Sequence, residues 1–138
     1  MAARFRAWFL THEATALAAA GDTAALLRIV PRIEAEGRRS GYGRDQRLHW
    51  YARGLLARAR GDREQAATFF RRAIFSPTAG FTRVNLELGR TLIEPHRPAE
   101  AIAVLEPALH GPIEASKLYV TRADLQALIV RARGRAVR

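Results

Sequence analysis

The chain contains few residues of the types that carry out chemistry. It has no cysteine in its 138 residues, which excludes thiol nucleophiles, disulfides and Cys-ligated zinc. Four histidines stand at positions 12, 49, 96 and 110, and none has metal-ligand spacing from another. The stretch THEAT, which contains His12 and Glu13, lacks the second histidine of a zinc-protease helix. The histidines therefore predict no metal site.

The remaining candidates for catalysis form no recognisable set either. The three serines are Ser40, Ser76 and Ser116, and no Ser–His–acid motif or carboxylate pair stands out. Gly41 and Gly43 could be mistaken for a phosphate-binding loop, but no strand pattern precedes them, which favours a plain connector. We therefore expect a protein without enzymatic activity, with no catalytic residues, no metal and no cofactor.

Arginine dominates the charged residues and is unevenly distributed. The formal net charge is +10, and Lys117 is the only lysine among the 23 basic residues. Residues 1–37 are neutral overall, residues 38–72 carry +7, residues 73–121 carry −1, and residues 122–138 carry +4. Such a basic band favours acidic partners, either protein or nucleic acid. A GC-rich, bacterial type of coding sequence also enriches arginine, so composition alone leaves open whether the band is functional.

Hydrophobic periodicity predicts an all-α protein of about seven helices. No run alternates as a strand does, no Asn-Gly or Asp-Gly hairpin turn occurs, and apolar residues recur at helical spacing throughout. Gly21 and Gly61 are expected to end helices, and Asp22 and Asp62 to cap the helices that follow. Gln65, three residues after Asp62, completes a capping box. We expect helices over about 3–20, 22–40, 45–59, 62–75, 81–93, 98–110 and 121–136.

The N-terminal segment MAARFRAWFLTHEATALAAAG allows three interpretations. Arginines before an apolar stretch resemble a secretory signal, and basic with aromatic residues resemble a membrane-surface helix. Against both, Phe5, Trp8, Phe9 and His12 share one helical face, which favours an amphipathic helix packed in the core. No apolar run approaches the ~20 residues that span a bilayer. We therefore predict a retained helix with Phe5 and Phe9 buried, which disfavours membrane attachment.

Two stretches of the sequence resemble each other at a spacing of 35 residues: GDREQAATFFRRAIFSPTAG at 61–80 and HRPAEAIAVLEPALHGPIEA at 96–115. A period of 34–35 residues built from helix–turn–helix units is typical of the tetratricopeptide repeat, and the chain resembles that family. Residues 47–80 follow its pattern with Trp50, Gly54, the Gly61-Asp62 turn, Ala66, Phe70, Ala73 and Pro77. Residues 82–115 follow it again with Leu88-Gly89, Ala101, Leu105, Ala108 and Pro112.

The resemblance implies one domain, residues 1–138, folded as a right-handed superhelical solenoid of antiparallel helix pairs. Its units are residues 3–40, 45–78 and 80–112, followed by a terminal helix over 121–136. The first unit fits the pattern less well and is separated from the second by 40 residues. The unpaired last helix either caps the array or continues into a longer one.

The resemblance also implies a binding function. In this family the first helix of each pair lines a concave face that binds an extended peptide or a partner's helix. Position by position, this nominates Tyr51, Leu55 and Arg58 in the second unit and Arg83, Leu86 and Arg90 in the third. The same positions nominate Trp8, Thr11, His12 and Thr15 in the first unit and Ile93 in the third. Alternatively, Tyr51 and Leu55 pack against the neighbouring unit and the arginines form a solvated face.

Tyr51 and Leu55 occupy the positions at which the family's carboxylate-clamp members carry lysine and asparagine, so capture of a C-terminal carboxylate is not expected. We expect a cytoplasmic scaffold or adaptor that binds an acidic protein or peptide, with self-association through the terminal helix as a further possibility. The alternatives are a nucleic-acid-associated basic repeat protein and a fragment or subunit of a larger tetratricopeptide-repeat assembly.

Overall fold

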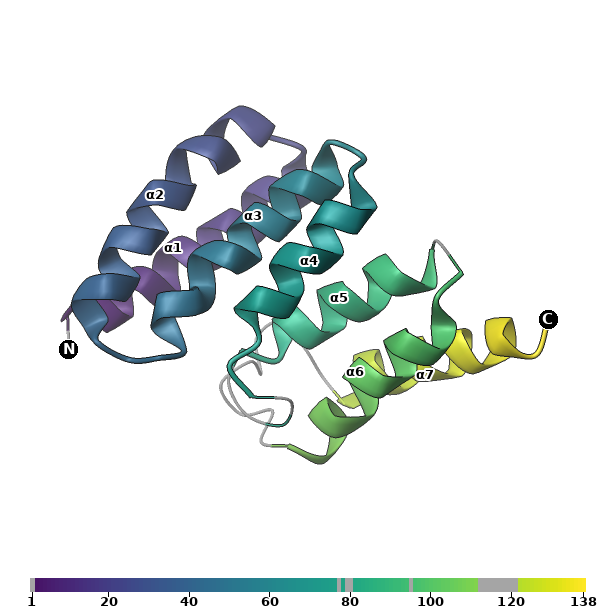
Figure 1. Ribbon diagram of the computed structural model, residues 1–138. Coiled ribbons are helices and arrows are strands. Elements are labelled where there is room, and N and C mark those ends of the chain that lie inside the picture. Colours follow the sequence, from purple (N-terminus) through teal and green to yellow (C-terminus); the bar gives the residue numbers. More distant parts are fainter. Residues whose placement is uncertain (1, 77, 79–80, 95, 112–121) are drawn as a thin grey trace. The chain divides into compact units, whose positions relative to one another are not determined.

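The computed structural model describes residues 2–76, 78, 81–94, 96–111 and 122–138 (Figure 1). Within these residues the chain forms seven α-helices and no strand, which confirms the predicted all-α class. None of the described helices combines the length and apolar character that crossing a bilayer requires. Four residues named in the sequence analysis lie outside the described ranges: Pro77, Pro112, Ser116 and Lys117.

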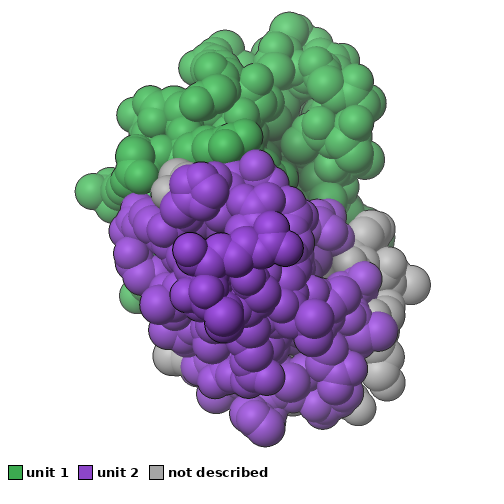
Figure 2. Space-filling model, turned by 90° about the vertical axis from the view of Figure 1, so that its right-hand side faces the viewer, with its two compact units in different colours: residues 1–73 green, residues 74–138 purple. Residues whose placement is uncertain are grey.

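The helices group into two compact units, Met1–Ala73 and Ile74–Arg138, which Figure 2 shows in different colours. The first unit contains α1 (Ala2–Ala20), α2 (Thr23–Ser40), the 3-10 turn η1 (Asp45–Arg47), α3 (Leu48–Ala59) and α4 (Arg63–Ala73). The second contains α5 (Arg83–Ile93), α6 (Pro98–His110) and α7 (Arg122–Ala136). The helix predicted from residue 45 thus begins with a 3-10 turn, and its α-helical part starts at Leu48. Each unit is described by itself below.

Three turns between helices have a common construction. Gly21 and Gly61 adopt positive φ values of 75° and 84°, as their predicted role at helix ends requires. Asp22 and Asp62 then accept hydrogen bonds from the backbone N–H three residues later, at 2.9 and 3.0 Å. His96, 35 residues after Gly61, takes the same left-handed conformation with φ of 65°. A residue with a Cβ is strained there, so the third turn keeps the geometry without the glycine.

The helix pairs α3–α4 and α5–α6 also share one close contact at the repeat spacing. A Cβ placed on Gly54 would lie 2.5 Å from ring carbons of Phe70. A Cβ on Gly89 would lie 2.7 Å from a methyl carbon of Leu105. In each pair the glycine of the first helix therefore admits a large side chain of the second, which is 16 residues further on in both cases.

Helix α1 buries a different face from the predicted one. Phe5 is 55% exposed and Phe9 is 70% exposed, so the prediction that they lie in the core is wrong. The buried residues include Ala7, Leu10 and Ala14, of which both alanines are completely inaccessible. Small side chains let α1 approach α2 and α3 closely, and the bulky phenylalanines are consequently left on the outer side.

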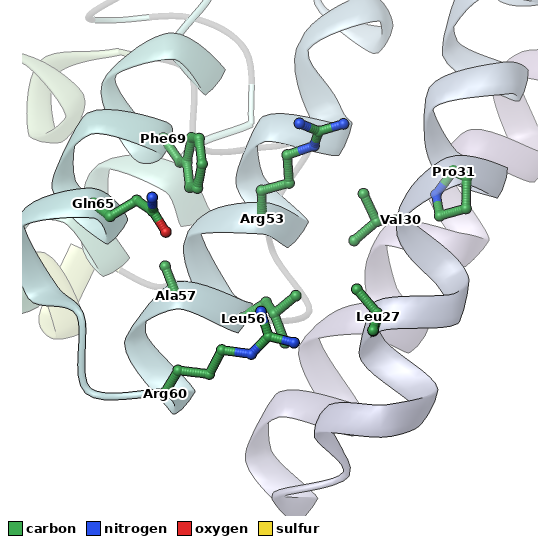
Figure 3. Close-up of a pocket in the computed structure, with 9 residues that line it drawn as sticks. All are labelled: Leu27, Val30, Pro31, Arg53, Leu56, Ala57, Arg60, Gln65 and Phe69. Carbon is green, nitrogen blue, oxygen red and sulfur yellow. The ribbon is translucent and has the colours of Figure 1, made fainter.

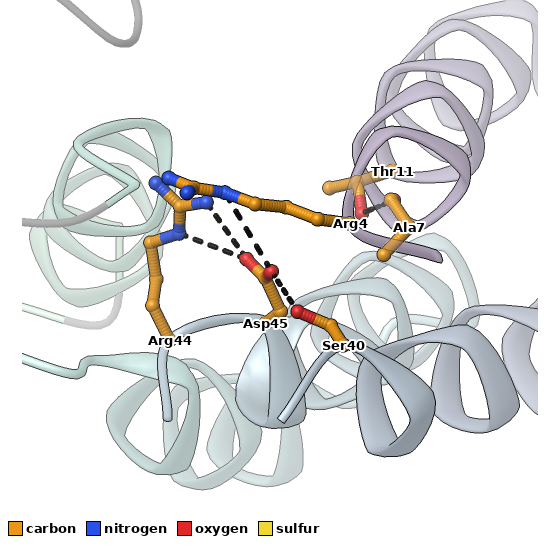
Figure 4. Close-up of polar contacts among 6 residues, drawn as sticks. All are labelled: Arg4, Ala7, Thr11, Ser40, Arg44 and Asp45. Atoms are coloured by element: carbon orange, nitrogen blue, oxygen red, sulfur yellow. Dashed lines mark hydrogen bonds and ion pairs between the residues drawn. The ribbon is translucent and has the colours of Figure 1, made fainter. Parts of the chain in front are cut away.

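A buried charged cluster ties α1 to the connector between α2 and α3 (Figure 4). The Asp45 side chain is fully buried and accepts hydrogen bonds from Arg44 Nη2 at 2.7 Å and Ser40 Oγ at 2.5 Å. Arg4 Nε lies 4.0 Å from the same carboxylate, and the Arg44 guanidinium lies 4.2 Å from the centre of the Trp8 ring. A buried carboxylate requires such partners, and through them the connector is held against α1.

Candidate partner-binding site

A groove of about 420 Å³ lies between α2 and the α3–α4 pair, entirely within the first unit (Figure 3). It is formed where α2 meets α3, because the connector anchored by Asp45 brings these helices side by side. Its lining comes from three helices and the turn after α3: Leu27, Val30, Pro31, Arg53, Leu56, Ala57, Arg60, Gln65 and Phe69.

The base of the groove is apolar, and its side chains are almost completely buried. Val30, Leu56 and Ala57 are each at most 6% exposed, so they present only small patches of apolar surface to a ligand. Leu27, one turn before Val30 on α2, is 50% exposed and forms one wall. Phe69 of α4 is half-buried on the opposite side. A partner could therefore bury apolar side chains here, which is the usual anchor of an interface.

Two arginines add positive charge to this apolar groove. The Arg53 side chain is 40% exposed, and its Nη2 lies 3.5 Å from Glu34 Oε2. Arg60, which follows the last residue of α3, is exposed and forms no ion pair within the described residues. Because guanidinium groups form paired hydrogen bonds with carboxylates, the two residues suit an acidic ligand.

An aromatic cluster adjoins the groove through Arg53 and Phe69. The Trp50 and Phe69 rings are stacked, with centroids 5.6 Å apart. The guanidinium groups of Arg53 and Arg72 lie 5.0 and 4.9 Å from the centre of the Trp50 ring. These cation–π contacts hold the arginines near the surface, where they add to the positive charge beside the groove. His49 also contacts Trp50, at 4.7 Å between ring centroids.

Of the two histidines of the first unit, His49 is buried and His12 is partly buried. Burial lowers the pKa of His12, and it also lowers the pKa of His49, although the charge of Glu34 partly opposes the latter shift. The position of His49 beside Trp50 predicts a helix-surface or groove residue, but its side chain is buried, at 8% exposure. Among the described residues, no three His, Asp or Glu side chains are grouped as metal ligands would be.

The three binding residues predicted on α3 lie on another side of that helix. Tyr51 is fully buried, and its hydroxyl lies 2.8 Å from the hydroxyl of Thr15, which the sequence had also nominated. Leu55 is 2% exposed, and Arg58 is partly exposed with its guanidinium 5.7 Å from the centre of the Phe70 ring. A partner could reach Tyr51 and Leu55 only after neighbouring side chains had moved. Their role in binding stays a prediction.

The other three predicted residues lie on α5, in the second unit. Arg83 Nε and Arg90 Nη1 lie 2.8 and 3.4 Å from the same oxygen of Glu87, whose side chain is 1% exposed. Leu86 is likewise buried, at 1% exposure. Glu87 thus draws Arg83 and Arg90 together, and its spacing of four residues from Arg83 and three from Arg90 is a sequence signal for both ion pairs. Their binding role also stays a prediction.

The residues of the groove were not among those predicted to bind. The family's concave-face positions nominate Tyr51 and Leu55, but the groove is lined by Arg53 and Arg60 of the same segment. These two arginines are seven residues apart, which is close to two helical turns. That spacing places two arginines on one helix side and could have been recognised. Helical periodicity groups Leu27 with Leu26 and Val30 and predicts its burial, but Leu27 is 50% exposed, so that prediction is wrong.

Comparison of the chain with protein-family models, with curated proteins and with solved structures finds no match.

Proposed function

We propose that the chain is a non-enzymatic protein-interaction module, a scaffold or adaptor, whose α2–α3–α4 groove binds an acidic segment of a partner protein. The observation that carries this proposal is the presence of an apolar base and two arginines in one groove. Apolar side chains of the partner would lie against Leu27 and Val30, and its carboxylates would lie near Arg53 and Arg60. The combination gives the segment both an anchor and a preferred charge.

A tetratricopeptide-type architecture, continued as a right-handed superhelical solenoid, is part of the same proposal. Its support is the repeated construction of the two helix pairs. Gly54 faces Phe70 as Gly89 faces Leu105, and the turns at Gly61 and His96 share one conformation at the same spacing of 35 residues. Arrays of such pairs offer extended surfaces for partners. The absence of cysteine from the sequence fits a cytoplasmic location.

The first test is a peptide-display selection against the purified full chain, followed by fluorescence anisotropy of the selected peptides. We expect peptides rich in Asp and Glu with apolar residues between them. Arg53→Gln/Arg60→Gln should weaken their binding at least about tenfold, because each charged hydrogen bond contributes roughly 1.5 kcal/mol or more. Leu27→Ser should weaken binding too, and its exposed position makes a folding defect unexpected.

The matched control is Arg135→Gln/Arg138→Gln, which removes the same two charges from the C-terminal end of the chain. Equal losses in the two double variants would show that affinity follows net charge, and the groove would lose its assigned role. Size-exclusion chromatography at low and high salt, with the absorbance ratio monitored, tests the alternative partner. Nucleic acid that leaves only at high salt would favour the basic band at residues 38–72 as a nucleic-acid surface.

A further inference from the structure

A second surface of the first unit, separate from the groove, consists of two exposed aromatic rings on α1. Phe5 and Phe9 are four residues apart, so they lie on the same side of the helix one turn from each other. Phe5 is 55% exposed and Phe9 is 70% exposed, which places both among the large apolar side chains that remain accessible to solvent in the described part of the chain. Neighbouring exposed apolar groups of this size mark interaction surfaces more often than single ones do.

Beside Phe9 the surface contains a basic hollow of about 370 Å³ between α1 and α2. Its charged lining is Arg6 from α1 with Arg32, Glu36 and Arg39 from α2. The Glu36 carboxylate pairs with Arg6 Nε at 3.0 Å and with Arg39 Nη1 at 3.1 Å. Glu36 therefore holds two guanidinium groups at the hollow while cancelling only one of the three positive charges.

Arg32 completes the positive charge of the hollow. It is exposed and has no ion pair within the described part of the chain. With Arg6 and Arg39 against Glu36, the lining keeps two uncompensated positive charges. An arginine already bonded to a carboxylate retains further N–H donors, so the hollow can offer several hydrogen bonds to an anion.

We infer that this surface, defined by Phe5, Phe9 and the arginines at positions 6, 32 and 39, attaches the protein reversibly to an anionic membrane. The phenylalanine rings would enter the boundary between headgroups and acyl chains, and lipid phosphates would lie against the arginines of the hollow. The exposed Glu13, one turn after Phe9, limits the contact to the first half of α1. This function goes beyond binding a partner protein at the groove.

The charge of the patch argues for a lipid surface over a second copy of the chain. In a twofold dimer through Phe5 and Phe9, the same arginines of both copies would be brought together and would repel each other. The apolar part is also small, since it rests on two rings, whereas stable interfaces bury roughly 1,200–2,000 Å². An anionic bilayer removes the repulsion and needs only a few inserted side chains, so attachment is expected to be weak and sensitive to salt.

Vesicle co-sedimentation with the purified full chain tests the inference. The chain should pellet with phosphatidylcholine vesicles that contain phosphatidylglycerol, should stay in solution with phosphatidylcholine alone, and should be released as salt is raised. Phe5→Ser/Phe9→Ser should lower the partition coefficient about tenfold or more, because two buried rings are lost. Arg32→Gln should lower it severalfold, with circular dichroism confirming that each variant is folded.

Two controls separate this surface from other causes. Phe75→Ser removes a phenylalanine of similar exposure, 53%, from another place and should leave sedimentation unchanged. Arg53→Gln/Arg60→Gln should also leave it unchanged, which separates this test from that of the groove. Unaltered pelleting of Phe5→Ser/Phe9→Ser, or no pelleting of the unmodified chain, would overturn the inference. Light scattering that detects a dimer disrupted by the same variant would assign the surface to a second copy instead.

Discussion

Replacing Gly54 by alanine tests the close packing of α3 against α4 at Phe70. The new Cβ would lie 2.5 Å from two ring carbons of Phe70, about 1 Å inside ordinary contact distance. Phe70 is fully buried and its ring is rigid, so relief requires the helices to move apart. We expect a steric cost of about 3 kcal/mol, at the upper end for overpacked cores. Alanine recovers about 1 kcal/mol through its higher helix propensity, which leaves a net destabilisation of about 2 kcal/mol.

Urea unfolding followed by far-ultraviolet circular dichroism measures this change in the free energy of unfolding. Gly134→Ala is the matched control, because Gly134 lies within α7 and a Cβ there meets nothing within 4 Å. The control should stabilise the chain by up to about 1 kcal/mol, so one substitution is expected to have opposite signs at two helical sites. In a Phe70→Ala background the penalty at Gly54 should disappear, because the ring carbons that the new Cβ would meet are absent. Stabilisation by Gly54→Ala in the unmodified chain would refute the close packing of this helix pair.

The turn at His96 and the buried histidines provide two further predictions. His96→Gly should raise the free energy of unfolding by about 0.5–1 kcal/mol, because it relieves a left-handed residue with a Cβ, whereas Gly61→Ala should lower it by about 1 kcal/mol. Urea unfolding measures both, and a destabilised His96→Gly variant would contradict the assigned conformation. Burial lowers the pKa of His12 and His49 below 6.5, so the unfolded chain binds more protons and stability should fall as pH drops through and below 6.5. Thermal unfolding at several pH values should give a flatter profile for His12→Gln/His49→Gln, and an unchanged slope would show that other groups cause it.

Local signals in the sequence were sufficient to place the helices and their turns. A glycine followed by aspartate needs only its own backbone conformation and the next three residues, and the predictions at Gly21 and Gly61 were confirmed for that reason. The orientation of α1 was different. The spacing of the large residues Phe5 and Phe9 predicted that their face of the helix is buried. Close packing against two helices instead buries the face that carries small residues.

The groove depends on contacts that no local pattern encodes. Leu27 and Arg60 are far apart in the sequence and line the same hollow only because α2 meets the α3–α4 pair. The position of α2 depends in turn on the buried Asp45, which the sequence placed simply at the start of a helix. The predicted helices therefore leave open which residues line the groove, and long-range packing determines them.

Tryptophan fluorescence can report on one of the two units separately. Its two tryptophans, Trp8 and Trp50, both belong to the first unit, where each lies against arginine guanidinium groups. Tryptophan emission therefore follows the unfolding of residues 1–73 alone, whereas circular dichroism sums the helices of both units. Recorded on one sample, the two signals separate the melting of one unit from that of the whole chain, and their coincidence measures how strongly the units stabilise each other.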